Sequence, residues 1–157
     1  MTYQAKFQTP FGALGIRCDV DALREITFLE PTVLAQIKFE QKKSPLATEV
    51  CKQLAAYFAD AAFKFNLPLN PLGTPHQSKV WQAISAIPLG QTRYYGDLAK
   101  SLHSSARAVG GACGSNPIPI IIPCHRVLSK SGLGGFMQQR AGQALDIKRW
   151  LLDHEQR

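Results

Sequence analysis

One short segment places a cysteine, a histidine and an arginine side by side at the end of the most apolar stretch of the chain. The stretch covers residues 116–127, and Cys124, His125 and Arg126 follow Pro123 near its end. Apolar surroundings keep bulk water from a thiol, while a neighbouring imidazole and a guanidinium favour the nucleophilic thiolate. We therefore interpret Cys124 as a candidate nucleophile and expect its neighbours to lower the pKa of its thiol.

The side chains of Cys124 and His125 do not easily meet directly. Adjacent residues diverge by about 100° on a helix and point to opposite faces of a strand. We therefore expect a bridging water, and a helical turn after Pro123 whose amides favour a thiolate. The imidazole also needs a group to hold it, and Glu155 and Asp153 are both candidates. The alternative is a buried, unreactive cysteine with an unrelated neighbour.

The composition is that of a folded protein in a reducing compartment. The chain has 157 residues, of which 45% are hydrophobic and 18% charged, enough for one sizeable core or two small ones. It opens without a basic region followed by an apolar one, and no run approaches the roughly 18 apolar residues of a membrane span. The four cysteines lack any C-x-x-C spacing, so neither a disulfide framework nor a metal site is indicated. We expect a cytoplasmic protein.

Basic residues are concentrated in the second half of the chain. Residues 1–75 hold eight Lys and Arg against seven Asp and Glu, whereas residues 76–157 hold ten against four, so the halves carry +1 and +6 of the total +7. A compact basic half is typical of a surface that binds nucleic-acid phosphates. A basic face that only improves solubility has the same composition, so charge alone leaves both readings open.

A proline-rich segment separates the two halves. Residues 68–75 contain three prolines, a glycine and an asparagine, which cannot continue a helix or a central strand. We predict an N-terminal domain over residues 1–67, a linker over 68–75 and a second domain over 76–157.

Apolar periodicity predicts a small α/β arrangement in the first domain. Residues 15–20 and 23–29 alternate between apolar and polar around a turn, as two paired strands would. A helix is expected to begin at Pro45 with Ser44 as its N-cap, and residues four apart form its buried stripe, namely Leu46, Val50, Leu54 and Phe58. Cys18 and Cys51 are interpreted as structural thiols.

The second domain is predicted to contain several short helices. One is centred on residues 80–84, and two more, over 95–102 and 106–112, are separated by a polar break. Two short helices in a basic region favour a helix-turn-helix, although short helix pairs occur in proteins of every function. A terminal helix is also expected, with Glu155 near its packed side and one apolar face formed by Ile147, Trp150, Leu151 and His154.

These motifs, in this order, resemble those of the O6-alkylguanine-DNA alkyltransferases, also called methylated-DNA–protein-cysteine methyltransferases. The similar segments cover about residues 76–155: the tyrosine segment 88–99, the recognition helix with its arginine finger 106–112, the asparagine hinge 116–117, the Pro-Cys-His-Arg-Val signature 118–127, and the ending 148–155 with its lysine and glutamate. The first domain resembles the family weakly, mainly through residues 9–12.

The resemblance implies an α+β fold, in which a small ribonuclease-H-like α/β domain precedes a mainly helical domain with a helix-turn-helix. It implies that Cys124 takes an alkyl group irreversibly from the O6 of guanine, and that His125, held by Glu155, removes the thiol proton through water. Tyr95 would protonate N3 of the leaving guanine, and Asn116 would brace the reactive turn. No cofactor is implied.

The same resemblance implies how DNA and the damaged base are bound. Arg107 would occupy the place of the extruded nucleotide, since a base inside the stack cannot reach a buried thiol. The other implied DNA contacts are Tyr94, Ala106, Ala108 and Gly110. The implied pocket residues are Val127, which would line the guanine pocket by its backbone, Lys148, which would support the site by hydrogen bonding to main chain, Gly135 and Phe136. The expected partner is double-stranded DNA containing O6-alkylguanine, or O4-alkylthymine, bound by a monomer.

Two departures from the family pattern and two alternatives remain. The chain is about four residues longer between Val127 and Trp150, and Phe136 stands in the loop 134–142 where tyrosine is common. Zinc is not expected, because only Cys18 matches the zinc ligands of some relatives. One alternative is a non-catalytic alkyltransferase-like protein, whose members carry tryptophan where this chain has Cys124. The other is a Cys-His hydrolase, a class that generally separates the two residues in sequence.

Overall fold

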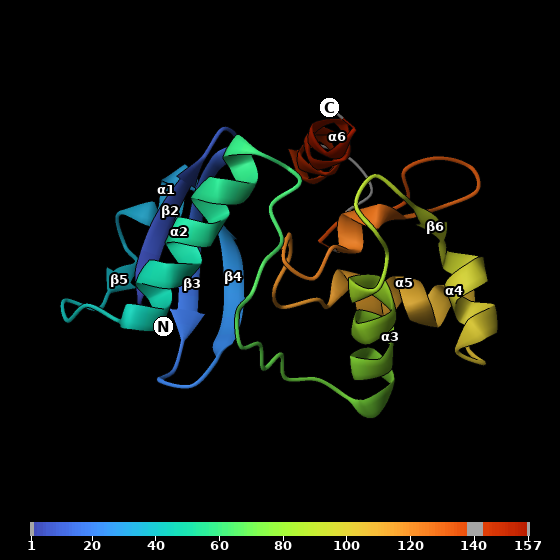
Figure 1. The fold of residues 1–157 in the computed structure, drawn as a ribbon, viewed down its shortest axis with the longest axis horizontal. Coiled ribbons are helices and arrows are strands. Elements are labelled where there is room, and N and C mark those ends of the chain that lie inside the picture. Colours follow the sequence, from blue (N-terminus) through green and yellow to red (C-terminus); the bar gives the residue numbers. More distant parts are fainter. Residues whose placement is uncertain (1, 138–142, 157) are drawn as a thin grey trace. The chain divides into compact units, whose positions relative to one another are not determined.

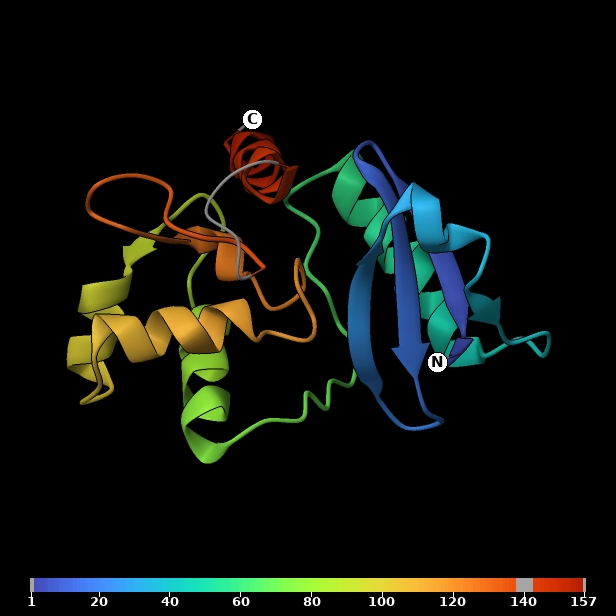
Figure 2. The ribbon, with the colours of Figure 1, turned by 180° about the vertical axis from the view of Figure 1, so that it is seen from behind.

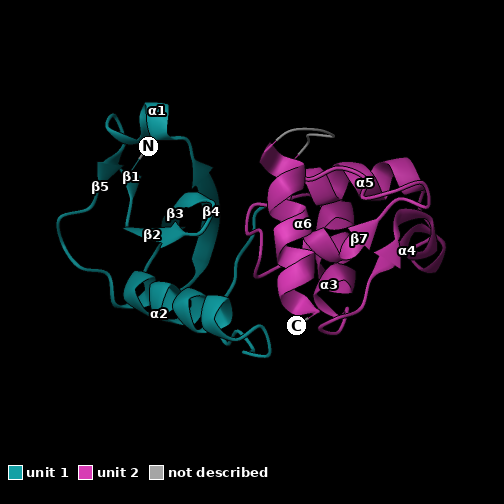
Figure 3. Ribbon diagram, turned by 90° about the horizontal axis from the view of Figure 1, so that it is seen from above, with its two compact units in different colours: residues 1–72 teal, residues 73–157 magenta. Residues whose placement is uncertain are grey.

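The computed structural model describes residues 2–137 and 143–156 and divides the chain into two compact units, residues 1–72 and 73–157 (Figure 3). Part of the proline-rich segment belongs to the first unit. The Leu23 amide donates to the Pro68 carbonyl at 2.8 Å, and the Asn70 amide donates to the Leu23 carbonyl at 2.9 Å. The beginning of the expected linker is therefore hydrogen-bonded to a strand, because its carbonyls and the amide of Asn70 remain available between the prolines.

The first unit is built on a three-stranded antiparallel sheet (Figure 1). Its order is β2 (Ala5–Thr9), β3 (Gly12–Cys18) and β4 (Leu23–Leu29). The expected pairing of the last two strands is confirmed, with Ile16 opposite Ile26, whereas β2 was not predicted. A short parallel pair, β1 (Thr2–Tyr3) and β5 (Lys38–Phe39), and a four-residue helix, α1 (Pro31–Leu34), complete the β-rich part.

Helix α2 (Pro45–Ala59) packs on this sheet and begins as expected. The Ser44 side chain accepts a hydrogen bond from the Ala47 amide at 3.1 Å. The buried apolar residues of the helix are Ala47, Val50, Leu54 and Tyr57. Ala47 and Tyr57 thus take the places that were predicted for Leu46 and Phe58. A spacing of four residues advances about 40° too far per step on a helix of 3.6 residues per turn, and alternating steps of three and four keep the seam on one face.

The second unit is mainly helical, as expected. Its helices are α3 (Pro75–Ser85), α4 (Tyr95–Ser101), α5 (Ala106–Gly114) and α6 (Gln143–Glu155), with a 3-10 turn, η1 (Cys124–Arg126). Two-residue strands β6 (Arg93–Tyr94) and β7 (Val127–Leu128) pair in parallel. The pair α4 and α5, joined by residues 102–105, is the predicted helix-turn-helix. None of the described helices has the length and apolar character needed to cross a membrane.

Helix α5 is fixed by its packing against α3 and α4 (Figure 2). The Trp81 indole donates from Nε1 to the carbonyl of Ala112 at 2.8 Å inside the unit. Val109 and Ala112 are buried on the same helix, whereas Arg107 is exposed. The packed face therefore holds the helix rigidly while its N-terminal residues face solvent.

Candidate active site

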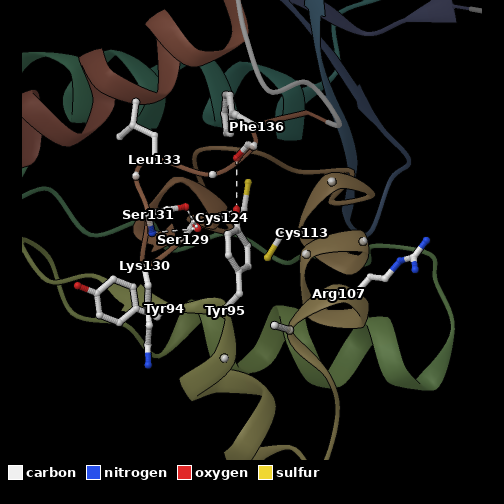
Figure 4. Close-up of a pocket in the computed structure, with 18 of the residues that line it drawn as sticks. Tyr94, Tyr95, Arg107, Cys113, Cys124, Ser129, Lys130, Ser131, Leu133 and Phe136 are labelled. Atoms are coloured by element: carbon white, nitrogen blue, oxygen red, sulfur yellow. Dashed lines mark hydrogen bonds between the residues drawn. The ribbon is translucent and has the colours of Figure 1, made fainter.

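A pocket of about 1350 Å³ opens in the second unit (Figure 4). It collects residues from β6, α4, α5, η1, the loop after β7 and α6. Two thiols and three aromatic side chains line it, among other residues: Cys113, Cys124, Tyr94, Tyr95 and Phe136. The pocket therefore brings the expected nucleophile together with the expected tyrosine.

Cys124 is the first residue of η1 and is 4% exposed. The turn expected after Pro123 is thus present. Burial raises the pKa of the Cys124 thiol, an effect opposed in part by hydrogen bonding from Asn116, by the charge of Lys148 and by the backbone amide of Cys124 itself. The expected lowering of this pKa in the free protein is wrong, because desolvation of the thiolate outweighs the favourable groups.

His125, the residue after Cys124, forms a buried pair with Glu155. His125 Nε2 lies 2.8 Å from Glu155 Oε2, and their side chains are 0% and 2% exposed. Glu155 is therefore the carboxylate that holds the imidazole, and the other candidate, Asp153, is exposed on the surface of α6.

Arg126 does not serve the thiol as expected but clamps Glu155. Its Nε donates to Glu155 Oε1 at 2.8 Å, its Nη2 to Oε2 at 3.1 Å, and its Nη1 to the Ile87 carbonyl at 2.7 Å. The guanidinium therefore binds the carboxylate in a bidentate manner and donates a further hydrogen bond to a main-chain oxygen. The cation that acts on Cys124 is Lys148 instead.

The charged groups around His125 determine which of its ring nitrogens can accept a proton. Burial lowers the pKa of His125, Glu155 opposes this, and the charges of Arg126 and Lys148 lower the pKa further. A neutral ring beside an ionised carboxylate donates from Nε2, so Nδ1 carries the free lone pair. Nδ1 is buried and has no hydrogen-bond partner among the described residues. His125 is therefore set up as a neutral base.

Asn116 braces the segment that leads to Cys124. Its Nδ2 donates to the Ile122 carbonyl at 2.9 Å, and its Oδ1 accepts from the Ile118 amide at 3.0 Å. Between them, Ile120 has a φ of 74°, a left-handed conformation that is strained for a β-branched residue. The two amide contacts hold a backbone that would otherwise relax, which is the bracing role that we expected.

Lys148 is fully buried and organises the loop after β7. Its Nζ donates to the carbonyls of Val127 at 2.8 Å, Leu133 at 2.6 Å and Gly135 at 2.9 Å. Burial lowers its pKa to about 8, while the two pocket thiols raise it. Neither Lys148 nor Val127 is among the pocket-lining residues. The carbonyl of Val127, expected to line the guanine pocket, binds the ammonium group instead.

The loop is also fitted closely to Tyr95. The tyrosine hydroxyl donates to the Gly135 carbonyl at 3.4 Å, and Phe136 is 3% exposed. Gly134 has a φ of 74°, and a Cβ placed there would lie 2.7 Å from the Tyr95 ring. Position 134 therefore requires glycine, because another residue would strain the backbone and its Cβ would overlap the Tyr95 ring. Part of the lengthened loop, residues 138–142, lies outside the described residues.

The expected DNA-binding residues lie at the pocket edge or beside it. Tyr94, Ala106 and Arg107 line the pocket and are exposed, Gly110 lines it and is half-buried, and Ala108 is exposed without lining it. The Arg107 side chain extends away from Cys124 (Figure 4).

Two further cations at the pocket were missed by the sequence reasoning. Lys130 and Arg149 line the pocket from the loop after β7 and from α6 and are exposed, and no Asp or Glu is among the described lining residues. Their signal in the sequence was only the general excess of basic residues. No group of three or more His, Cys, Asp or Glu in the described parts could hold a metal.

A helix-turn-helix beside a pocket with a buried thiol and a His-Glu pair defines a DNA-binding type of domain with a candidate cysteine nucleophile. Family models match the two units separately: residues 75–157 match "6-O-methylguanine DNA methyltransferase, DNA binding domain", and residues 2–71 match its "ribonuclease-like domain". The chain belongs to the 6-O-methylguanine DNA methyltransferase family.

Individual relatives are similar to this chain over almost its whole length. The constitutive methylated-DNA–protein-cysteine methyltransferase of Bacillus subtilis (strain 168) is 40% identical, over 99% of this chain and 96% of the relative. The crystal structure of the Mycobacterium tuberculosis O6-methylguanine methyltransferase is 34% identical, with a TM-score of 0.80 over 98% of this chain and 92% of that one. The structure of the M. tuberculosis protein in complex with DNA is 35% identical, with a TM-score of 0.78 over 99% and 93% of the two chains.

Replacement of Gly134 by alanine should destabilise the second unit. The new Cβ would meet the Tyr95 ring at 2.7 Å in a backbone of positive φ, and strain of this kind costs about 1–3 kcal/mol. Denaturant unfolding of Gly134→Ala should show this loss in the free energy of unfolding. Gly96→Ala is the matched control, since no atom lies within 4 Å of a Cβ there, and an equal loss in both variants would contradict the proposed fit.

Proposed function

We propose that this protein is a DNA repair methyltransferase that moves the alkyl group of O6-alkylguanine in DNA irreversibly onto Cys124. The observation that carries the proposal is the placement of Cys124 in the pocket, with the His125–Glu155 pair behind it. Membership of the family and relatives named methylated-DNA–protein-cysteine methyltransferases support the same reaction.

The reaction follows from the buried charges. The thiol proton of Cys124 passes through a water to Nδ1 of His125, and the resulting imidazolium is stabilised by Glu155. Lys148 favours the thiolate, which attacks the alkyl carbon while the bond between that carbon and O6 breaks. Tyr95 donates its hydroxyl proton to N3 of the guanine, so that a neutral base leaves. The product is a thioether, which cannot transfer the group back, so each molecule acts once.

The partner is double-stranded DNA, from which the damaged nucleotide is turned into the pocket. Helix α5 supplies the contacts, with Arg107 in the place of the extruded nucleotide and Tyr94, Ala106, Ala108 and Gly110 around it. The exposed cations Lys130 and Arg149 favour phosphates at the pocket edge. We place the protein in the cytoplasm, where a reducing environment fits four free thiols, and propose that it acts as a monomer without a cofactor.

Both alternatives are less well supported. A non-catalytic alkyltransferase-like protein needs neither a reactive thiol nor a base, whereas this chain has Cys124 followed by the His125–Glu155 pair. A hydrolase releases its product and turns over, whereas an alkyl thioether is stable to water.

Incubation with excess O6-methylguanine DNA should add one methyl group per chain, on Cys124 alone. Intact-mass measurement gives the number of methyl groups, and fragmentation of the tryptic peptides, one of which (108–126) holds both Cys113 and Cys124, assigns the modified cysteine. Cys124→Ala should take up no methyl group and should still bind DNA, since the phosphate contacts do not involve the thiol. Repeated turnover, or label on Cys18, Cys51 or Cys113, would disprove the proposal.

The rate of transfer should depend on pH through the relay. Glu155→Gln removes the negative charge that raises the pKa of His125, so the ring accepts the thiol proton less readily. The variant, and His125→Ala, should transfer about 10²-fold more slowly at pH 7. Without the relay the thiol loses its proton only to solvent, and burial raises its pKa, so the rising limb of the rate profile should move to higher pH. A structural defect alone would lower the rate at every pH without moving the limb, and that result would argue against the relay.

Arg107 should matter for duplex DNA and little for a free base. Extrusion of a base leaves a gap that is unfavourable by a few kcal/mol unless it is filled. Arg107→Ala should therefore lose at least tenfold more activity on duplex O6-methylguanine than on free O6-benzylguanine. Lys79→Ala, which removes an exposed charge on α3 outside the pocket lining, is the control for the loss of one positive charge. Equal losses of Arg107→Ala on both substrates would show that Arg107 is only structural.

A further inference from the structure

The proposed reaction leaves one nucleophile of the pocket unused. Cys113 lies in the last turn of α5, is 7% exposed and lines the same pocket as Cys124. Figure 4 shows its side chain directed from α5 toward the part of the pocket where Tyr95 and Cys124 lie. Two thiols, one on α5 and one on η1, therefore face the same pocket.

The two thiols are close enough to influence each other through their charges. The pKa of Cys113 is raised to about 12, first by burial and then by the charge of Cys124, while Lys148 opposes the shift. Cys113 therefore stays protonated at neutral pH and does not compete for the alkyl group. Cys113 can still react with an electrophilic sulfur, and the sulfur of an oxidised Cys124 would lie in the same pocket.

We propose that Cys113 is the resolving thiol of Cys124, which pairs with it in a reversible disulfide after oxidation by a peroxide. The thiolate of Cys124 attacks a peroxide oxygen, the O–O bond breaks, and Cys124 becomes a sulfenic acid with release of hydroxide. The sulfur of Cys113 then attacks the Cys124 sulfur, the S–O bond breaks, and the hydroxyl group leaves as water with the thiol proton. The peroxide supplies both oxidising equivalents.

The proposed disulfide sets a requirement on the backbone at the end of α5. A disulfide needs Cα atoms about 4.4–6.8 Å apart, and Cys113 is followed by Gly114, the last residue of α5, and by Ser115. The Asn116 amide donates to the Cys113 carbonyl at 3.2 Å and the Ser115 amide to the Gly111 carbonyl at 3.1 Å, so two main-chain contacts close the helix next to a glycine, whose backbone can adjust. A resolved disulfide also prevents the irreversible oxidation of Cys124 to the sulfinic acid.

Proteolysis with trypsin gives a direct readout, because residues 108–126 form one peptide that contains both thiols and no other cysteine. Wild type, Cys113→Ser and the control Cys51→Ser, a thiol of the first unit, are treated with dilute hydrogen peroxide and then with a thiol-blocking reagent. In wild type and Cys51→Ser the peptide should lose two hydrogens and take up no blocking group. In Cys113→Ser it should instead carry added oxygen at Cys124.

Activity on O6-methylguanine DNA completes the test. After reduction with dithiothreitol, wild type should recover most of its transfer activity, and Cys113→Ser at least tenfold less. The idea is overturned if the wild-type peptide keeps two blockable thiols or gains oxygen, or if Cys113→Ser recovers equally. This inference rests on the proposed function only in taking Cys124 as a nucleophile. Untreated samples of each variant test the function itself, so a lack of transfer there is distinguished from a lack of disulfide.

Discussion

A carboxylate buried inside a protein must be paired, and the site depends on how Glu155 meets this requirement. Its two oxygens accept from His125 and twice from Arg126. Because Arg126 also donates to the Ile87 carbonyl, Glu155 and Arg126 together join α6, η1 and the segment that follows α3. Removal of one partner from a buried ion pair typically costs about 3–5 kcal/mol. The contacts that orient the base therefore also hold the second unit together.

Lys148 likewise both holds the chain in place and acts on the Cys124 thiol. Three main-chain carbonyls satisfy its ammonium group and shape the loop after β7, while its charge favours the thiolate of Cys124. Burial opposes every charge in this region: it raises the pKa of both thiols and lowers those of His125 and Lys148. Glu155 and Arg126 nevertheless form an ion pair in the resting site, and the proposed proton transfer would add a thiolate and an imidazolium beside Lys148 and Glu155.

The sequence predicted the parts of this arrangement that depend on local pattern. The cap at Ser44, the pairing of β3 with β4, the two helices around residues 102–105 and the turn at Cys124 all follow from short-range spacing. Arg126 was misjudged because adjacency in sequence places it beside Cys124, whereas the turn directs its side chain to Glu155 on α6. The main-chain contacts of Lys148 were implied only by family resemblance, since the three carbonyls come from separate points of the chain. Lys130 and Arg149 have no local pattern at all, and only the fold brings them to one pocket.

The raised pKa of Cys124 accounts for selectivity in a protein that reacts once. A thiol with an ordinary or lowered pKa is substantially ionised near neutral pH and reacts with many small electrophiles. In the proposed reaction the thiolate forms as His125 accepts the proton, and a base in the pocket would displace water and strengthen the interactions of the new charges with Lys148 and Glu155. Reactivity is thereby coupled to the arrival of a substrate that fits between Tyr95 and the loop. A buried thiol with a raised pKa would therefore suit an irreversible transfer better than a permanently activated one, because fewer molecules would be lost to irreversible side reactions, whereas oxidation by a peroxide would be reversed through Cys113.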